Sequence, residues 1–271
     1  MSLSKREIIH ILENKLNIKK YTIHENLTVD VNQDVKFEHS GIKYFIPFKF
    51  GIIKGNFHIY GMELSSLKNC PDEVYGEFYC SNNKLTTLEG CPKIVDGNFL
   101  CDNNKLKTLE HAPEKINGNF NCERNKLISL LASPKNIKGC FFCSSNKLIS
   151  LEGFPEFLGK SFFCDNNKLI TLEYLPKIIQ GNLSCQSNNL SSLIYLPGFI
   201  KGDLNIACNK IEKEELFSFN SNIPGNIRSD FGNKENFLYE VKIAKIKKEK
   251  KELLTLSPLH VEIVSNKNKR I

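Results

Sequence analysis

Ten cysteines are the residues of this 271-residue chain with the richest chemistry, since thiolates act as nucleophiles, bind metals and form disulfides. Six of them recur every 21 residues, at Cys80, Cys101, Cys122, Cys143, Cys164 and Cys185. Isoleucine stands at the same place in two further rows, at Ile59 and Ile206. We therefore interpret the six as small buried apolar side chains. A row of parallel thiols is a poor disulfide framework, and free thiols fit a reducing cytosol.

Two other patterns bear on catalysis and metal binding. Cys140 and Cys143 form a C-x-x-C pair, but residues three apart in a strand point to opposite faces, which argues against a metal or redox site. The sequence lacks the motifs of nucleotide-binding loops, serine hydrolases and zinc proteases. The six histidines share no position of the repeat and lie at His10, His24, His39, His58, His111 and His260. We therefore expect a protein that is not an enzyme and that holds no metal or cofactor.

The element that must position these residues is a 21-residue repeat, P-x-x-I-x-G-x-F-x-C-x-x-N-x-L-x-x-L-x-x-x. Its first column is marked by Pro71, Pro92, Pro113, Pro134, Pro155, Pro176 and Pro197. Apolar columns eight and ten alternate with more polar neighbours, which predicts one short strand per coil with one buried face. So short a unit cannot bury that face alone, so the coils must stack.

Column thirteen is asparagine in seven rows, and a buried asparagine can bind the backbone of its own turn and of the neighbouring coil. We expect a structural ladder formed with the column-ten cysteines by Asn83, Asn104, Asn125, Asn146, Asn167 and Asn188. The repeat pattern becomes less regular toward the N-terminus, where Met62 replaces the asparagine, as is typical of a terminal repeat.

The segment F-x-C-x-x-N-x-L, for example from Phe99 to Leu106, resembles the second half of the leucine-rich repeat motif L-x-x-L-x-L-x-x-N-x-L. The short, proline-bearing form is most similar to bacterial effectors of this family and to related phage or giant-virus proteins. The resemblance implies an α/β repeat solenoid with a parallel strand ladder of about nine coils and mostly non-helical connections. One departure is that an apolar residue lies four positions before the phenylalanine, with glycine between, so a bulge or tight turn is expected there.

The flanks divide the chain into three segments. Residues 1–49 comprise a predicted capping helix over 4–18, whose Ser4 and Glu7 have capping-box spacing, followed by strands and a degenerate repeat. Residues 50–211 form the solenoid, and residues 212–271 a C-terminal cap with a basic helix over 234–255. From residue 232 onward there are ten basic and five acidic residues, which carry most of the net charge of +7. No stretch predicts a transmembrane helix or a secretory signal peptide.

The outward columns of the strand ladder form the predicted binding surface, on the concave face of the solenoid. Exposed aromatic residues in a row, with acids beside them, indicate an interface with a protein, or packing against a flank of the chain itself. The candidate contact residues are His58, Tyr60, Glu77, Tyr79, Leu100, Asp102, Asn121, Glu123, Phe142, Phe163 and Asp165. We expect the aromatic residues to anchor the partner and the carboxylates to steer a basic patch on it.

The remaining charged columns have a simpler interpretation. Lysines in column fourteen and glutamates in column nineteen predict a solvated edge that keeps the coils soluble. Because acids lie beside the lysines, nucleic-acid binding by this edge is not favoured. The alternative is a nucleic-acid or anionic-membrane binder that uses the basic stretch 242–251. A ubiquitin-ligase domain, which some effectors of this repeat type carry, is excluded because the tail is too short and contains no cysteine.

The resemblance to bacterial effectors implies a protein that binds, and inhibits or scaffolds, a host protein or another effector of the same organism. Such a virulence protein would be cytosolic or translocated into a host cell. The sequence itself leaves the partner and the oligomeric state open.

Overall fold

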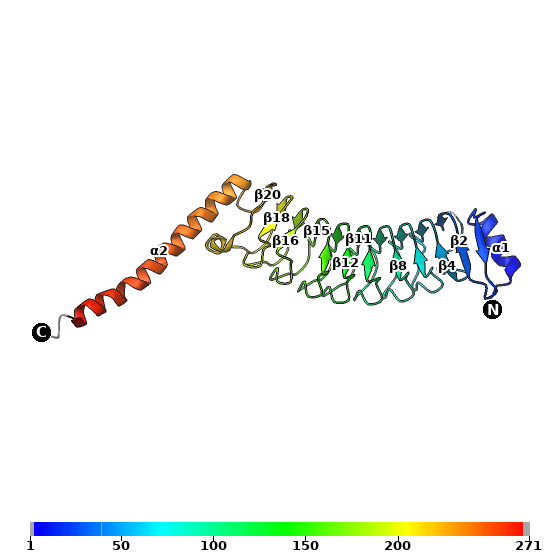
Figure 1. Ribbon diagram of the computed structural model, residues 1–271, viewed down its shortest axis with the longest axis horizontal. Helices are drawn as coiled ribbons and strands as arrows, with labels where there is room; N and C mark the ends of the chain where they lie inside the picture. Colours follow the sequence, from blue (N-terminus) through cyan, green and yellow to red (C-terminus); the bar gives the residue numbers. More distant parts are fainter. Residues whose placement is uncertain (1–2, 39, 268–271) are drawn as a thin grey trace.

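The computed structural model describes residues 3–38 and 40–267, and only the backbone from residue 256 onward. Its coils form a parallel β-solenoid of about nine turns. They stand side by side along the long axis of the molecule, with helix α1 (Lys5–Asn14) at one end and helix α2 (Lys234–Lys267) at the other (Figure 1). The predicted repeat solenoid is therefore confirmed. The connections between the strands of successive coils contain no α-helix among the described residues, so the leucine-rich-repeat class remains a prediction.

Each coil contributes two short strands, and the expectation of one strand per coil was wrong. The ten-stranded parallel sheet comprises β3 (Val35–Lys36), β5 (Phe57–His58), β7 (Phe78–Tyr79), β9 (Phe99–Leu100), β11 (Phe120–Asn121), β13 (Phe141–Phe142), β15 (Phe162–Phe163), β17 (Leu183–Ser184), β19 (Leu204–Asn205) and β20 (Ile227–Arg228). The additional strand arises because the apolar residue of column four is buried and pairs with its equivalent in the next coil, as Val74 does with Val95.

These additional strands form an eight-stranded sheet and a separate pair. The eight strands are β1 (Tyr21–Ile23), β2 (Val29–Val31), β4 (Phe50–Ile53), β6 (Glu73–Val74), β8 (Ile94–Val95), β10 (Lys115–Ile116), β12 (Asn136–Ile137) and β14 (Phe157–Leu158). Only β1 is antiparallel to its neighbour. The pair is β16 (Ile178–Ile179) with β18 (Phe199–Ile200).

The glycine of column six forms the corner between the two strands of a coil. The Gly97 N–H donates to the Gly76 carbonyl oxygen at 2.9 Å, and a Cβ on Gly97 would lie 2.6 Å from the same oxygen. No side chain fits at such a distance, so only glycine lets the coils stack at this corner. The eight-stranded sheet ends at the coil in which column six is not glycine. There Lys160 occupies column six, the glycine has moved to Gly159, and β14 does not pair with β16.

The core is layered by column. Phenylalanines of column eight stack from coil to coil, as Phe120 does on Phe141 with ring centroids 5.3 Å apart, and the cysteines of column ten lie beside them, fully buried. The asparagines of column thirteen bind backbone on both sides. The Asn125 Nδ2 donates to the carbonyls of Cys101 and Cys122 at 3.1 Å, and its Oδ1 accepts from the Leu106 N–H at 2.9 Å. Each asparagine thus fixes one coil to the preceding one.

A third side closes each coil between the ten-stranded sheet and the next proline. We define the third side as columns fourteen to nineteen. It begins after a left-handed residue in column twelve, such as Asn103 with φ of 57°, and ends before a second one in column twenty, such as His111 with φ of 70°. Leucines of columns fifteen and eighteen point inward, so columns fourteen, sixteen and nineteen face outward.

Both ends of the solenoid are covered. Helix α1 carries the predicted capping box, in which Ser4 and Glu7 bind each other's backbone N–H, and it buries Ile8 and Leu12. At the other end, α2 and the 3-10 helix η1 (Lys213–Ser218) cover the last coil through Phe237. Helix α2 extends past its expected end at residue 255 to Lys267, and residues 268–271 of the predicted C-terminal segment lie outside the described residues. Within residues 3–38 and 40–267, no helix has the length and hydrophobicity needed to span a bilayer.

Candidate functional site

The candidate site lies on the outward side of the ten-stranded sheet. We call it the outer strip and define it by the residues predicted above: His58, Tyr60, Glu77, Tyr79, Leu100, Asp102, Asn121, Glu123, Phe142, Phe163 and Asp165. Strand register makes the strip continuous, because Tyr79 pairs with Leu100, Leu100 with Asn121, and Asn121 with Phe142. Tyr60 is exposed, and the other members are half-buried.

The first aromatic cluster of the outer strip lies on the early coils. The Tyr79 ring contacts His58 edge to face, with centroids 5.6 Å apart, and Tyr60 at 5.1 Å. The His58 Nε2 lies 3.3 Å from the Glu77 Oε1, and the Asn98 amide donates to the other oxygen of Glu77 at 3.0 Å. Burial and then the Asp102 carboxylate raise the pKa of Tyr79, so its hydroxyl stays protonated at neutral pH. This cluster offers rings and hydroxyl groups beside a carboxylate.

The second cluster is apolar. Phe142 and Phe163 stack with centroids 4.9 Å apart and ring planes within 2° of parallel. Asn121 separates this cluster from Leu100, and its side chain accepts from the Glu123 N–H at 3.0 Å. The two clusters therefore form neighbouring patches of one surface with a polar residue between them.

Carboxylates of column eleven run beside both clusters. Asp165 accepts from the Ser184 hydroxyl at 2.6 Å and from the Gln186 N–H at 2.7 Å, and Asp102 accepts from the Ser81 hydroxyl of the preceding coil. Glu123 lies between these two acids in the column. Partial burial, reinforced by Asp102 and Asp165 and opposed by Ser144 and Arg124, raises the pKa of Glu123. The strip thus concentrates negative charge that a cation on a partner would stabilise.

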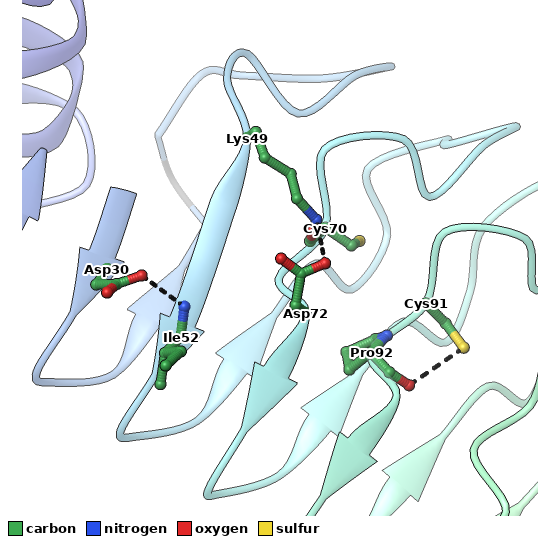
Figure 2. Close-up of polar contacts among 7 residues, drawn as sticks. All are labelled: Asp30, Lys49, Ile52, Cys70, Asp72, Cys91 and Pro92. Carbon is green, nitrogen blue, oxygen red and sulfur yellow. Dashed lines mark hydrogen bonds and ion pairs between the residues drawn. The ribbon is translucent and has the colours of Figure 1, made fainter. Parts of the chain in front are cut away.

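The column-ten thiols, Cys70 and Cys91 lack the features of activated nucleophiles. Burial raises the pKa of the column-ten cysteines and of Cys70, and it raises the pKa of Cys91 to about 12. Figure 2 shows the Lys49 ammonium near Cys70, where it donates to the Cys70 carbonyl at 2.6 Å and pairs with Asp72 at 2.8 Å. The Cys91 thiol is directed at backbone carbonyls, 3.5 Å from that of Pro92 and 3.0 Å from that of His111. Such thiols are structural rather than reactive.

The two cysteines of the C-x-x-C pair lie in different parts of the coil. Cys143 is buried in the core column and Cys140 is half-buried at the corner of the coil, and both thiols are free. Across the part of the chain that the structure describes, no cluster of three or more His, Cys, Asp or Glu residues has a geometry suited to a metal ion. His39 lies outside the described residues.

Sequence reasoning missed one surface. In column sixteen, three consecutive coils present Ile128, Ile149 and Ile170, with 58%, 58% and 65% of their surfaces exposed. They lie on the third side, between the lysines of column fourteen and the glutamates of column nineteen. The sequence signal for this surface is the change of column sixteen from polar residues to isoleucine in these three rows. The balanced charges of the neighbouring columns predicted a solvated edge instead.

The basic stretch 242–251 forms the middle of α2. Phe237, Val241 and Ala244 are buried against the end of the solenoid, while most of the following lysines are exposed. A groove of about 490 Å³ lies between η1 and α2, and in it the Lys248 ammonium sits 3.6 Å from the Phe217 ring centroid. Beyond this point α2 projects away from the coils (Figure 1).

No protein-family model matches the sequence, and no curated protein shows significant similarity to it.

Proposed function

We propose that the protein is a non-enzymatic binding module whose outer strip holds a partner protein with a basic surface patch. The observation that carries the proposal is the continuous row of half-buried residues, aromatic or apolar on both sides of Asn121, flanked by the carboxylates of Asp102, Glu123 and Asp165. Rings on a rigid sheet are effective anchors because they lose little conformational entropy on binding.

The two components of the strip have separate roles. Tyr79, Leu100, Phe142 and Phe163 supply apolar area for the centre of an interface, where most of the binding energy is concentrated. The acids supply electrostatic complementarity, which accelerates association and rejects partners with acidic surfaces. Bound there, the module acts by covering a functional surface of its partner or by joining it to another protein. The resemblance to bacterial effectors makes the partner a host protein or another effector of the same organism.

The test is an affinity pull-down with the full chain from host-cell lysate and from the lysate of the source organism, after nuclease treatment and at near-physiological salt. We expect a stoichiometric protein that is lost with Tyr79→Ala plus Phe142→Ala. The control is Tyr75→Ala plus Phe157→Ala, because these rings, 48% and 50% exposed, are more accessible than those of the outer strip but lie along the eight-stranded sheet. Loss of the partner in the control, or its retention in the strip variant, would refute the proposal.

A second candidate function follows from the exposed lysines of α2. They would bind the phosphates of nucleic acid or of anionic lipid, with an affinity that falls steeply as salt rises. Glu249 and Glu252 lie among these lysines and weaken such binding. Recovery of nucleic acid or lipid alone, in a pull-down without nuclease, and its loss when residues 245–271 are deleted would favour this function over the outer strip.

A further inference from the structure

The third side presents three parallel rows of different chemistry. Lysines of column fourteen form one edge, at Lys84, Lys105, Lys126, Lys147 and Lys168. Isoleucines 128, 149 and 170 form the centre. Glutamates of column nineteen form the other edge, at Glu89, Glu110, Glu152 and Glu173. Because the chain runs in one direction around each coil, the isoleucine row must lie between the two charged rows.

Backbone hydrogen bonds hold these rows in register. The Ile149 N–H donates to the Ile128 carbonyl at 3.1 Å, and the Lys147 N–H donates to the Leu127 carbonyl at 2.9 Å. Hydroxyl groups of column seventeen fix the turn that carries the glutamates, since the Ser150 Oγ accepts from the Glu152 N–H at 3.0 Å. Equivalent side chains therefore repeat at the spacing of the coils, about 4.8 Å.

The charges of the third side have few partners within the chain. Lys84 pairs with Glu63 at 2.6 Å. Within residues 3–38 and 40–255, no ion pair engages the lysines from Lys105 to Lys168 or the four glutamates of column nineteen. The exposed isoleucines likewise lack a cover. An apolar row with a cationic edge and an anionic edge fits a surface that bears the same rows in reverse order.

A second copy of the chain presents that surface. If two copies face each other across a two-fold axis parallel to the solenoid axis, the lysine edge of one meets the glutamate edge of the other at the same coil. A two-fold axis perpendicular to the solenoid would instead set lysine against lysine and glutamate against glutamate, which is repulsive. The charge pattern therefore selects the parallel arrangement.

We propose that the third side is a homodimer interface in which two solenoids pack parallel and in register. Ile149 of each copy contacts Ile149 of the other, Lys147 pairs with Glu152, and Lys168 pairs with Glu173. The coil with Lys126 forms neither of its two symmetric pairs, because Leu131 replaces the glutamate in both copies. There the leucine, 53% exposed, extends the apolar centre. The apolar row is short, so the dimer is weak, with a dissociation constant in the micromolar range, and it weakens further in high salt.

Charge exchange tests the interface by sedimentation equilibrium of the full chain. We expect Lys147→Glu plus Lys168→Glu, and separately Glu152→Lys plus Glu173→Lys, to raise the dissociation constant at least tenfold. A one-to-one mixture of the two variants should form a heterodimer, because every reversed charge then meets its opposite. A monomeric wild-type chain at 100 µM (about a hundredfold above a micromolar constant), variants that dimerise normally, or a mixture that stays monomeric would overturn the proposal.

Cysteine cross-linking tests the orientation. In a Cys208→Ser background, which removes the exposed thiol, Ile128→Cys, Ile149→Cys and Ile170→Cys are oxidised one at a time. The parallel arrangement places each new thiol beside its own equivalent, so all three variants should form covalent dimers. An antiparallel arrangement allows this for one of them at most, and cross-linking at a single position would contradict the proposal. Circular dichroism melting curves verify that each variant is folded.

Discussion

The outer strip, on the ten-stranded sheet, and the third side belong to the same coils. They differ in how their exposed residues change along the solenoid. The outer strip changes residue type at nearly every coil in column nine, from His58 and Tyr79 to Leu100, Asn121 and Phe142. The third side repeats lysine and glutamate in most rows. A surface without a repeat fits a partner that has none, whereas a repeating surface fits a partner with the same period. One solenoid can therefore offer a unique site and a self-complementary site at once.

The largest effect on stability is expected when the buried asparagine ladder that supports both surfaces is interrupted. Asn125→Ala leaves the buried Leu106 N–H without its acceptor. It also removes one of the two donors to the carbonyls of Cys101 and Cys122, which keep Asn104 and Asn146 respectively. An unsatisfied buried group costs about 1–3 kcal/mol, so we expect the unfolding free energy to fall by about 2 kcal/mol, measured by urea unfolding. Asn136→Ala, on the exposed face of the eight-stranded sheet, is the matched control and should change stability by less than about 0.5 kcal/mol. Similar effects for the two variants would contradict the ladder's role.

A change confined to the outer strip should affect partner binding without affecting the third side. Asp102→Asn plus Glu123→Gln removes two adjacent charges of the outer strip and leaves the rings. We expect association with the captured partner to slow about tenfold and to lose most of its salt dependence, as measured by surface plasmon resonance. Homodimerisation should be unaffected. Unchanged association kinetics would show that the carboxylates do not steer the partner.

The turn of column twelve, between the ten-stranded sheet and the third side, allows a smaller, stabilising change. Ser145 occupies the left-handed position of column twelve with φ of 57°, where other coils have asparagine, such as Asn103 and Asn166. Asparagine adopts this conformation more readily than serine, so Ser145→Asn should raise the unfolding free energy by about 0.5–1 kcal/mol. Thermal melting provides the measurement. Pull-down and dimerisation should be unchanged, and a destabilised variant would contradict this explanation of the turn.

The smallest expected effect on stability depends on pH and concerns Glu123 of the outer strip. The pKa of Glu123 is raised in the folded state, so the folded chain binds this proton more readily than the unfolded chain. The ionised carboxylate therefore lowers stability at neutral pH, and this cost disappears as pH falls through the folded-state pKa. Glu123→Gln should accordingly be more stable than wild type at pH 7, by a few tenths of a kcal/mol given its partial exposure.

The matched control for this pH effect is Glu156→Gln, an exposed glutamate outside both the outer strip and the third side. Unfolding free energies of the three proteins are compared from pH 7 down to pH 4. The advantage of Glu123→Gln should shrink as pH falls, because protonated glutamate and glutamine are both neutral. An advantage that is constant with pH would show that packing rather than ionisation distinguishes the two side chains.

The sequence predicted the features that every coil repeats. The prolines and asparagines at 21-residue intervals indicated a stacked solenoid, and the spacing of Ser4 and Glu7 indicated the capped helix α1. The additional strand of each coil was missed because column four carries one inward residue, and two-residue strands have no alternation to detect. The end of the eight-stranded sheet at β14 depends on a one-residue displacement of the corner glycine to Gly159, which is visible only once the close approach of the coils is known.

For the surfaces, the sequence identified which residues of the outer strip face outward but not which of them touch. The contact of Phe142 with Phe163 follows from strand register, whereas the Tyr60–Tyr79 contact depends on side-chain conformations that no pattern specifies. The third side was interpreted as a solvated edge because its lysines and glutamates balance. The exposure of Ile128, Ile149 and Ile170 between them changes that interpretation.

The most direct test of the account is one quantitative pull-down with four baits: the wild-type chain, Tyr79→Ala plus Phe142→Ala, Tyr75→Ala plus Phe157→Ala, and Lys147→Glu plus Lys168→Glu. If the outer strip is the binding site, one stoichiometric protein is recovered on every bait except the Tyr79/Phe142 variant. Retention of the partner by that variant, or its loss from the Lys147/Lys168 variant, would contradict the assignment of the outer strip as the site for a distinct partner.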